Sequence, residues 1–166
     1  MKKILITCLA VMCCTMSFAE EINIEEDGIC YILDDTDNTA TVTKSDNKDF
    51  LGIPSEVIYN ETTYKVTSIG DNAFTDCKSL ESVDIPGTVM SIGYQAFAGC
   101  SSLVSLNINE GVKNIGESAF QGCSELTSIK IPESVGSIGD FAFYKCYGQT
   151  SVSLQSEEGG VYKSEK

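Results

Sequence analysis

Four cysteines recur every 23 residues and are the first candidates for chemistry in this chain: Cys77, Cys100, Cys123 and Cys146. A structural metal site needs clustered ligands, commonly C-x-x-C pairs or cysteines combined with histidine. Here the cysteines occur singly, and the chain contains no histidine. A catalytic thiol would also lack its usual base. The spacing therefore predicts neither a metal site nor a cysteine nucleophile.

Two structural states remain open for these cysteines. Neighbouring strands lie about 4.8 Å apart, which is within the usual Cα separation of a disulfide, about 4.4–6.8 Å. Equivalent side chains in a stack point the same way, however, whereas a disulfide needs them to converge. We favour a ladder of reduced, buried thiols, with disulfides as the alternative. With Cys30, five cysteines follow residue 19, so at least one is a free thiol or forms an intermolecular bond.

Two further polar groups could carry chemistry. The acidic run Asp34–Asn38 suggests a calcium loop, but such a loop would need an oxygen ligand and a glycine where Thr39 and Ala40 stand. We predict a solvated turn there. A serine column lacks a histidine base and is predicted to be a polar surface; its members are Ser82, Ser105, Ser128 and Ser151. We expect no catalytic residue, metal or cofactor, and hence no enzyme.

These residues are positioned by an internal repeat that runs over residues 69–154 without insertion or deletion. Within one unit, Val83 and Ile85 alternate with polar residues, as in a half-buried strand, and Pro86 ends it. Val89 and Ile92 form a second short extended piece. A third segment has apolar residues spaced as on one face of a short helix or turn; they are Ala73, Phe74, Cys77 and Leu80. One such unit cannot bury its core alone and must stack on neighbours.

The pattern I-G-x-x-A-F-x-x-C-x-x-L-x-x-φ-x-I-P, where φ is apolar, resembles the BspA-type leucine-rich repeat of bacterial surface and secreted proteins. Residues 28–68 resemble the N-terminal segment of that family. The resemblance implies a leucine-rich repeat solenoid of short parallel strands and helical turns. It also implies a role in adhesion or in binding host proteins.

The chain is predicted to contain four regions. Residues 1–19 have the charged start, apolar run and Ser17-Phe18-Ala19 end of a signal peptide. Residues 20–68 form a β-rich N-terminal cap with two hairpins, one over residues 29–43 and one over residues 57–67. Residues 69–154 are the repeats, and residues 155–166 are a polar tail. We expect export to the periplasm, the cell surface or the medium, and no membrane span.

Charge and surface variation suggest the partners. Loss of residues 1–19 removes two lysines and no acids, so the formal net charge of −13 becomes −15. This charge argues against nucleic acid and anionic membranes as partners. One outward column of strand positions holds a different residue in each repeat, whereas the neighbouring columns keep the same residue types. It is either the binding face or a set of solvated positions that are free to vary. Its members are Asp84, Asn107, Lys130 and Ser153. We expect protein partners, such as host matrix or cell-envelope proteins, and self-association through the C-terminal end as the alternative.

Overall fold

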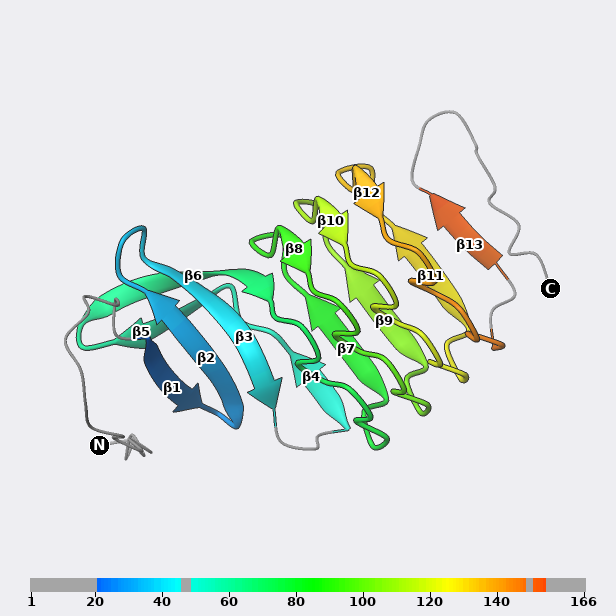
Figure 1. Ribbon diagram of the computed structural model, residues 1–166, viewed down its shortest axis with the longest axis horizontal. Helices are drawn as coiled ribbons and strands as arrows, with labels where there is room; N and C mark the ends of the chain where they lie inside the picture. The colour runs from blue at the N-terminus through cyan, green and yellow to red at the C-terminus, as the bar shows by residue number, and fades with distance from the viewer. Residues whose placement is uncertain (1–20, 46–48, 149–150, 155–166) are drawn as a thin grey trace, which may run out of the picture.

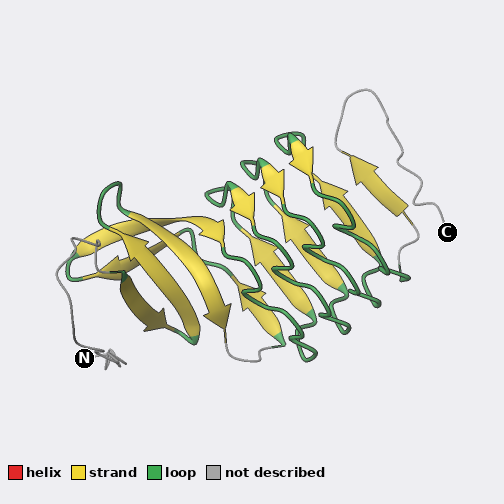
Figure 2. Cartoon of the chain, viewed as in Figure 1, coloured by secondary structure: helices red, strands yellow, loops and turns green. Residues whose placement is uncertain are grey.

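The computed structural model describes residues 21–45, 49–148 and 151–154. The predicted signal peptide and polar tail lie outside these ranges. Within them the chain forms strands and turns, and nothing there forms a helix that could traverse a lipid bilayer (Figure 2). The strands are β1 (Ile22–Glu26), β2 (Ile29–Asp34), β3 (Thr39–Ser45), β4 (Phe50–Gly52), β5 (Glu56–Tyr59), β6 (Thr62–Ile69), β7 (Ser82–Ile85), β8 (Ser91–Ile92), β9 (Ser105–Ile108), β10 (Asn114–Ile115), β11 (Ser128–Ile131), β12 (Ser137–Ile138) and β13 (Ser151–Leu154).

The repeats stack as coils of a solenoid with two ladders of parallel strands (Figure 1). The longer strands form one side, where β4, β7 and β9 pair in order and β11 pairs with β13. The short strands β8, β10 and β12 form the second ladder. From β7 onward, paired residues in both ladders are 23 residues apart, for example Val83 with Leu106 and Ile92 with Ile115. The predicted repeat solenoid is thus present.

The first coil contains an inserted hairpin. Leu51 on β4 pairs with Val83 on β7, an offset of 32 residues, whereas Ile69 on β6 pairs with Ile92 at the regular offset of 23. Nine extra residues therefore lie between the two strands of this coil. They are accommodated by the antiparallel β5–β6 hairpin, whose turn residues Asn60 and Glu61 both have positive φ.

The N-terminal strands continue the second ladder, so the cap and the repeats share one sheet. β1, β2 and β3 pair antiparallel in order, and β3 pairs parallel with β6, whose end pairs with β8. Both hairpins expected from the sequence are present, as β2–β3 and β5–β6. Strand β1 was not expected; it reaches β2 through Asp27 and Gly28, whose φ values of 51° and 75° fit a tight hairpin turn.

The expected helical turns are wrong: segments such as residues 71–76 are turns, and the described ranges hold no helix. Asn72 and Asp76 have φ values of 58° and 59°, and the same two positions of each later coil repeat them. A right-handed helix needs negative φ throughout. Phe74 N–H donates to the carbonyl oxygen of Ala96 in the next coil (2.7 Å) instead of closing a helical turn. The turn side therefore carries a third ladder of hydrogen bonds between coils.

The core is a set of identical side chains stacked along the solenoid. Phe74, Phe97, Phe120 and Phe143 lie nearly parallel, with successive ring centroids 4.8, 5.1 and 5.3 Å apart. The first three of these rings are fully buried. Offset stacked rings at such distances attract one another beyond the burial of their area. The phenylalanine stack therefore fits the spacing of the coils and stabilises their alignment.

Two glycines allow a direct test of how closely the coils approach. A Cβ added at Gly116 would lie 2.6 Å from backbone atoms of Gly93, whereas one added at Gly136 would meet nothing nearer than the Lys113 carbonyl oxygen at 3.8 Å. We expect Gly116→Ala to lower the free energy of unfolding by about 1–3 kcal/mol and Gly136→Ala to change it by less than about 0.5 kcal/mol. Urea unfolding measures both. Equal midpoints for the two variants would contradict the close contact.

Candidate functional site

The predicted binding column lies on the outer face of the longer strands. Asp84, Asn107 and Lys130 are all exposed there. Asp84 is in register with Asn107, and Lys130 is in register with Ser153 on β13. β9 and β11 are successive members of the stack (Figure 1). The strand register thus places Asp84 beside Asn107 and Lys130 beside Ser153, in two successive parts of the stack.

Hydrogen bonds order the first half of this column. The Asn107 Nδ2 donates to Asp84 Oδ1 (2.7 Å), and the Asn109 Nδ2 donates to the same oxygen (3.1 Å). The Asn109 Nδ2 also donates to the Ile85 carbonyl oxygen (2.9 Å), which ties the cluster to the backbone. Asn109 was not among the predicted residues. It adds an amide group to the column and limits the motion of the Asp84 carboxylate.

An exposed aromatic residue extends this face toward the N-terminus. Phe50 on β4 is 63% exposed and is paired in register with Ser82. Its ring lies over Gly52, since a Cβ built on that glycine would be 3.3 Å from the ring. Gly52 is in turn the register partner of Asp84. We name the set Phe50, Asp84, Asn107, Asn109, Lys130 and Ser153 the strand-face column.

Phe50 was missed by sequence reasoning because the inserted hairpin shifts the first coil out of the 23-residue register. The signal was nevertheless present. Leu51 and Ile53-Pro54 have the same spacing as Val83 and Ile85-Pro86. Aligning these two segments would have placed Phe50 in the serine column and Gly52 in the variable column.

The other polar candidates form local hydrogen bonds. Asp34 Oδ1 accepts from the Thr36 N–H (2.8 Å), and Asp37 Oδ1 accepts from the Thr39 hydroxyl (2.7 Å). Asp35 accepts from the hydroxyl of Tyr64. Within the described ranges, no three His, Cys, Asp or Glu side chains are grouped to hold a metal ion. In the serine column, Ser82 is in register with Ser105, and Ser128 with Ser151.

The cysteine column lies inside the turn side of the solenoid. Cys77, Cys100, Cys123 and Cys146 carry free thiols, and all but Cys77 are buried. The three buried thiols donate to the carbonyl oxygen of the phenylalanine 26 residues earlier, at 3.1, 3.3 and 3.1 Å. Each thiol therefore binds the backbone of the preceding coil. This geometry gives the column a structural role between coils.

Raised pKa values make Cys77, Cys100 and Cys123 poor nucleophiles. Burial raises the pKa of Cys100 to about 12 and also raises the pKa of Cys77. A hydrogen bond with the Cys146 side chain, together with burial, raises the pKa of Cys123. The thiolate is the reactive form of cysteine, so at neutral pH Cys77, Cys100 and Cys123 remain protonated.

We expect alkylation to separate the cysteines by position. At pH 8, below the raised pKa values, iodoacetamide should label Cys100 and Cys123 on the order of 100-fold more slowly than Cys77, because reaction needs local opening. After denaturation all of them should label at similar rates. Peptide mass spectrometry reads each site. A pair that stays unlabelled in denaturant until a reductant is added would show a disulfide and contradict the free-thiol column.

Comparison with known proteins identifies the repeat. The family model described as BspA type leucine-rich repeat region (6 copies) matches residues 55–162, more than half of the chain. The chain belongs to this family. The match begins within the first coil, after β4 and before the inserted hairpin. Among curated proteins, none matches this chain.

Solved bacterial structures share the fold. A leucine-rich repeat protein from Bacteroides capillosus is 31% identical with a TM-score of 0.75, and the alignment covers 81% of this chain and 99% of that one. One from Bacteroides ovatus is 33% identical with a TM-score of 0.61 and covers 78% and 40%. A leucine-rich cell surface protein from Faecalibacterium prausnitzii is 28% identical with a TM-score of 0.60 and covers 82% and 55%. The BspA-type chain thus spans nearly all of the first and about half or less of the other two.

Proposed function

We propose that this protein is an exported binding module that holds a protein partner on the strand-face column. The observation that carries the proposal is the line of exposed polar side chains that ends at the exposed aromatic ring of Phe50. Parallel strands of a solenoid present such a line as an extended surface. The similar Faecalibacterium prausnitzii structure is described as a cell surface protein, and the predicted signal peptide agrees with export.

The composition of the strand-face column suits a protein partner. Aromatic residues often provide much of the binding energy at interfaces, and polar side chains around them supply direction and specificity. Phe50 offers the aromatic contact, while Asp84 and Asn109 are already ordered by hydrogen bonds. Ordering before binding lowers the entropy lost on association. The partners that we favour are host matrix proteins or cell-envelope proteins.

Charge further restricts the partner. The formal net charge of −13 disfavours nucleic acid and anionic lipid surfaces, and it would steer a basic protein toward this chain. The absence of histidine from the sequence removes the usual general base for an activated serine or cysteine. We therefore propose a role in binding rather than in catalysis.

The test compares two exposed apolar residues on different sides of the solenoid. Phe50 lies on the strand-face column, and Met90, 51% exposed, directly precedes β8 in the second ladder. Binding to immobilised matrix proteins and envelope extracts is measured by biolayer interferometry. We expect Phe50→Ala to weaken binding by about 2 kcal/mol, or roughly 30-fold, as for a central aromatic contact. Met90→Ala should leave binding unchanged.

Two results would contradict this assignment. Equal losses for the two variants would show that the partner does not distinguish the strand face. Absence of saturable binding to every protein of the panel would argue against a binding module. Lys130→Ala separates the contributions of charge and aromatic contact, because removing an exposed charge acts mainly on the association rate and its salt dependence.

A second candidate function, self-association, is favoured by the last described coil. Phe141, Tyr144 and Tyr147 are 60%, 51% and 77% exposed. In the three preceding coils the same positions hold only polar residues or alanine: Asn72, Gln95 and Ser118; Thr75, Ala98 and Gln121; Lys78, Ser101 and Ser124. Clustered exposed aromatic residues are typical of association sites. A second copy of the chain that meets this end would cover them.

Phe141→Asn tests self-association without a cost in stability. Phe141 has a φ of 57°, a conformation that asparagine adopts readily and phenylalanine does not. If the end associates, light scattering should show a mass that rises with concentration in the parent protein and stays at one chain in the variant. Tyr94→Ser, on an earlier coil, should behave like the parent. A parent mass of one chain at every concentration would contradict the hypothesis.

A further inference from the structure

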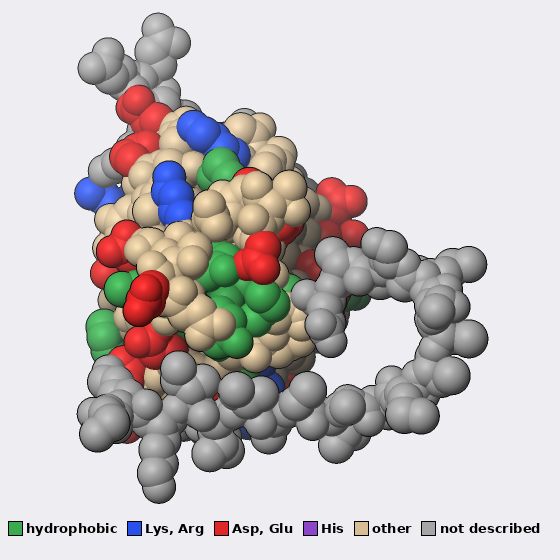
Figure 3. Space-filling view, turned by 90° about the vertical axis from the view of Figure 1, so that its left-hand side faces the viewer, with side chains coloured by type: hydrophobic (Ala, Val, Ile, Leu, Met, Phe, Trp, Pro, Cys, Tyr) green, Lys and Arg blue, Asp and Glu red, His purple; other side chains and the backbone are tan. Residues whose placement is uncertain are grey.

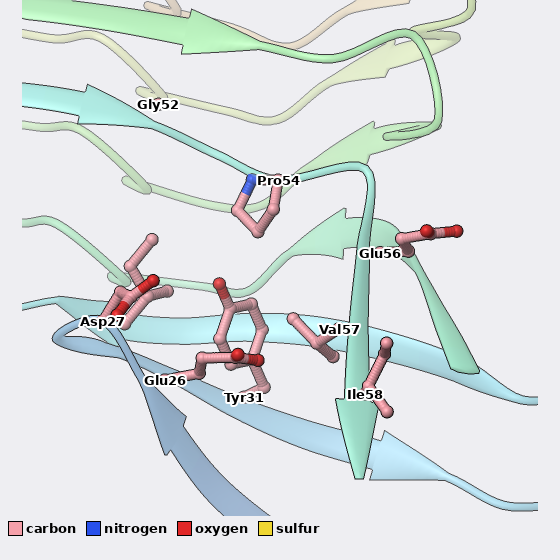
Figure 4. Close-up of a pocket in the computed structure, with 9 residues that line it drawn as sticks. Glu26, Asp27, Tyr31, Gly52, Pro54, Glu56, Val57 and Ile58 are labelled. Carbon is pink, nitrogen blue, oxygen red and sulfur yellow. The ribbon is translucent and has the colours of Figure 1, made fainter. Parts of the chain in front are cut away.

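A cavity of about 310 Å³ lies in the N-terminal part of the molecule, away from the strand-face column. It is bounded by the β1–β2 turn, by the segment after β4 and by β5 (Figure 4). Its lining includes Glu26, Asp27, Tyr31, Pro54, Val57 and Ile58. Figure 3 shows this end of the molecule, where hydrophobic side chains gather and Asp and Glu side chains lie beside them. The cavity thus combines apolar walls with an acidic border.

Tyr31 gives the cavity a polar group at its base. Its side chain is 1% exposed, and its hydroxyl points into the cavity toward Pro54 (Figure 4). A ligand that donates a hydrogen bond at this point would bind the hydroxyl oxygen.

The electrostatic surroundings indicate the charge of such a ligand. Burial, followed by the charges of Glu26 and Asp27, raises the pKa of Tyr31 above its ordinary value, so the hydroxyl stays neutral and can accept a hydrogen bond. Glu26 is half-buried, lines the same cavity, and is near enough for its charge to act on Tyr31. None of the residues that line the cavity is a lysine. A cationic donor would satisfy both the hydroxyl and the carboxylate.

The walls indicate the rest of the ligand. Pro54, Val57 and Ile58 offer carbon surface beside the polar groups. A short alkyl stem would bury its methylenes there, at about 0.8 kcal/mol for each CH₂. The cavity is at the small end of the range of known ligand sites, about 300–1,000 Å³. It is therefore large enough for a slender chain and a small head group.

We propose that this cavity binds a primary alkylammonium group. The ammonium donates hydrogen bonds to the Tyr31 hydroxyl oxygen and the Glu26 carboxylate, and its alkyl stem lies against Pro54 and Val57. The same chemistry is carried by a lysine side chain of a partner protein and by a free diamine. The site is separate from the strand-face column, so it stands or fails independently of the proposed function.

Titration calorimetry of the purified full chain with n-pentylammonium chloride tests the proposal. n-Pentanol, which has the same stem without the charge, should bind about tenfold more weakly or not at all. Glu26→Gln should weaken binding of the ammonium about fivefold or more. Glu25→Gln is the matched control because Glu25 is the neighbouring residue, is exposed and does not line the cavity. Both variants change the net charge equally, so only Glu26→Gln should affect a local site.

Tyr31→Phe supplies a second, independent readout. It should weaken ammonium binding about threefold or more, because the hydroxyl oxygen that accepts from the ammonium is removed. Equal affinities for pentanol and pentylammonium would overturn the proposal. Equal effects of Glu25→Gln and Glu26→Gln would also overturn it, because they would indicate general attraction to an acidic chain.

Two further probes distinguish the sources of the ligand. Nα-acetyl-lysine amide presents a lysine side chain as it occurs within a protein, and 1,5-diaminopentane presents a free diamine. Tighter binding of the first supports a lysine of a partner protein, and tighter binding of the second supports a small metabolite. If neither probe competes with n-pentylammonium, the site does not select for the ammonium group and the proposal is wrong.

Discussion

The hydrogen bond between one coil and the next is the interaction on which the rest of this structure depends. It joins the longer strands, the short strands and the turns to their neighbours, and it holds adjacent backbones about 4.8 Å apart. Side chains at equivalent positions must fit that spacing. The phenylalanine rings meet it with centroids 4.8–5.3 Å apart. Gly93 and Gly116 meet it by having no side chain. The same residue types recur at the stacked positions because each must fit this spacing between adjacent coils.

The same constraint explains why the turn side is not helical. Ala73, Phe74, Cys77 and Leu80 have the spacing of a helix face, and the sequence predicted helical turns from it. A helix would direct each N–H within its own coil, whereas Phe74 donates to the next coil. The required positive φ falls on Asn72, but Gln95, Ser118 and Phe141 occupy that position in later coils. Residue types at this position therefore gave little signal of the turn geometry, whereas Gly99 and Gly122 at the second position of positive φ did give one.

Features that repeat could be predicted from the sequence, whereas those that occur once could not. The 23-residue shift predicted the strand register, and the register lines up Asp84 with Asn107. Phe50 lies before the inserted hairpin, where the shift becomes 32 residues, and so it was missed. β1 was also missed, although an Asp-Gly pair between apolar alternations marks a hairpin. The cavity beside Tyr31 is lined by three separate segments of the chain, and no regular spacing in the sequence relates these segments to one another.

The division between fixed and free positions also bears on where function lies. A column that must fit the coil spacing cannot change without loss of stability, so specificity has to come from outward columns and from the ends. Phe141 illustrates the point. Its positive φ costs a bulky residue on the order of 1 kcal/mol or more, and the same position holds Asn72 in the first full coil. Nothing in the stacking of the described coils requires a phenylalanine there, because its side chain is 60% exposed. A residue that costs stability and adds exposed apolar surface is better explained by contact with another molecule than by the fold.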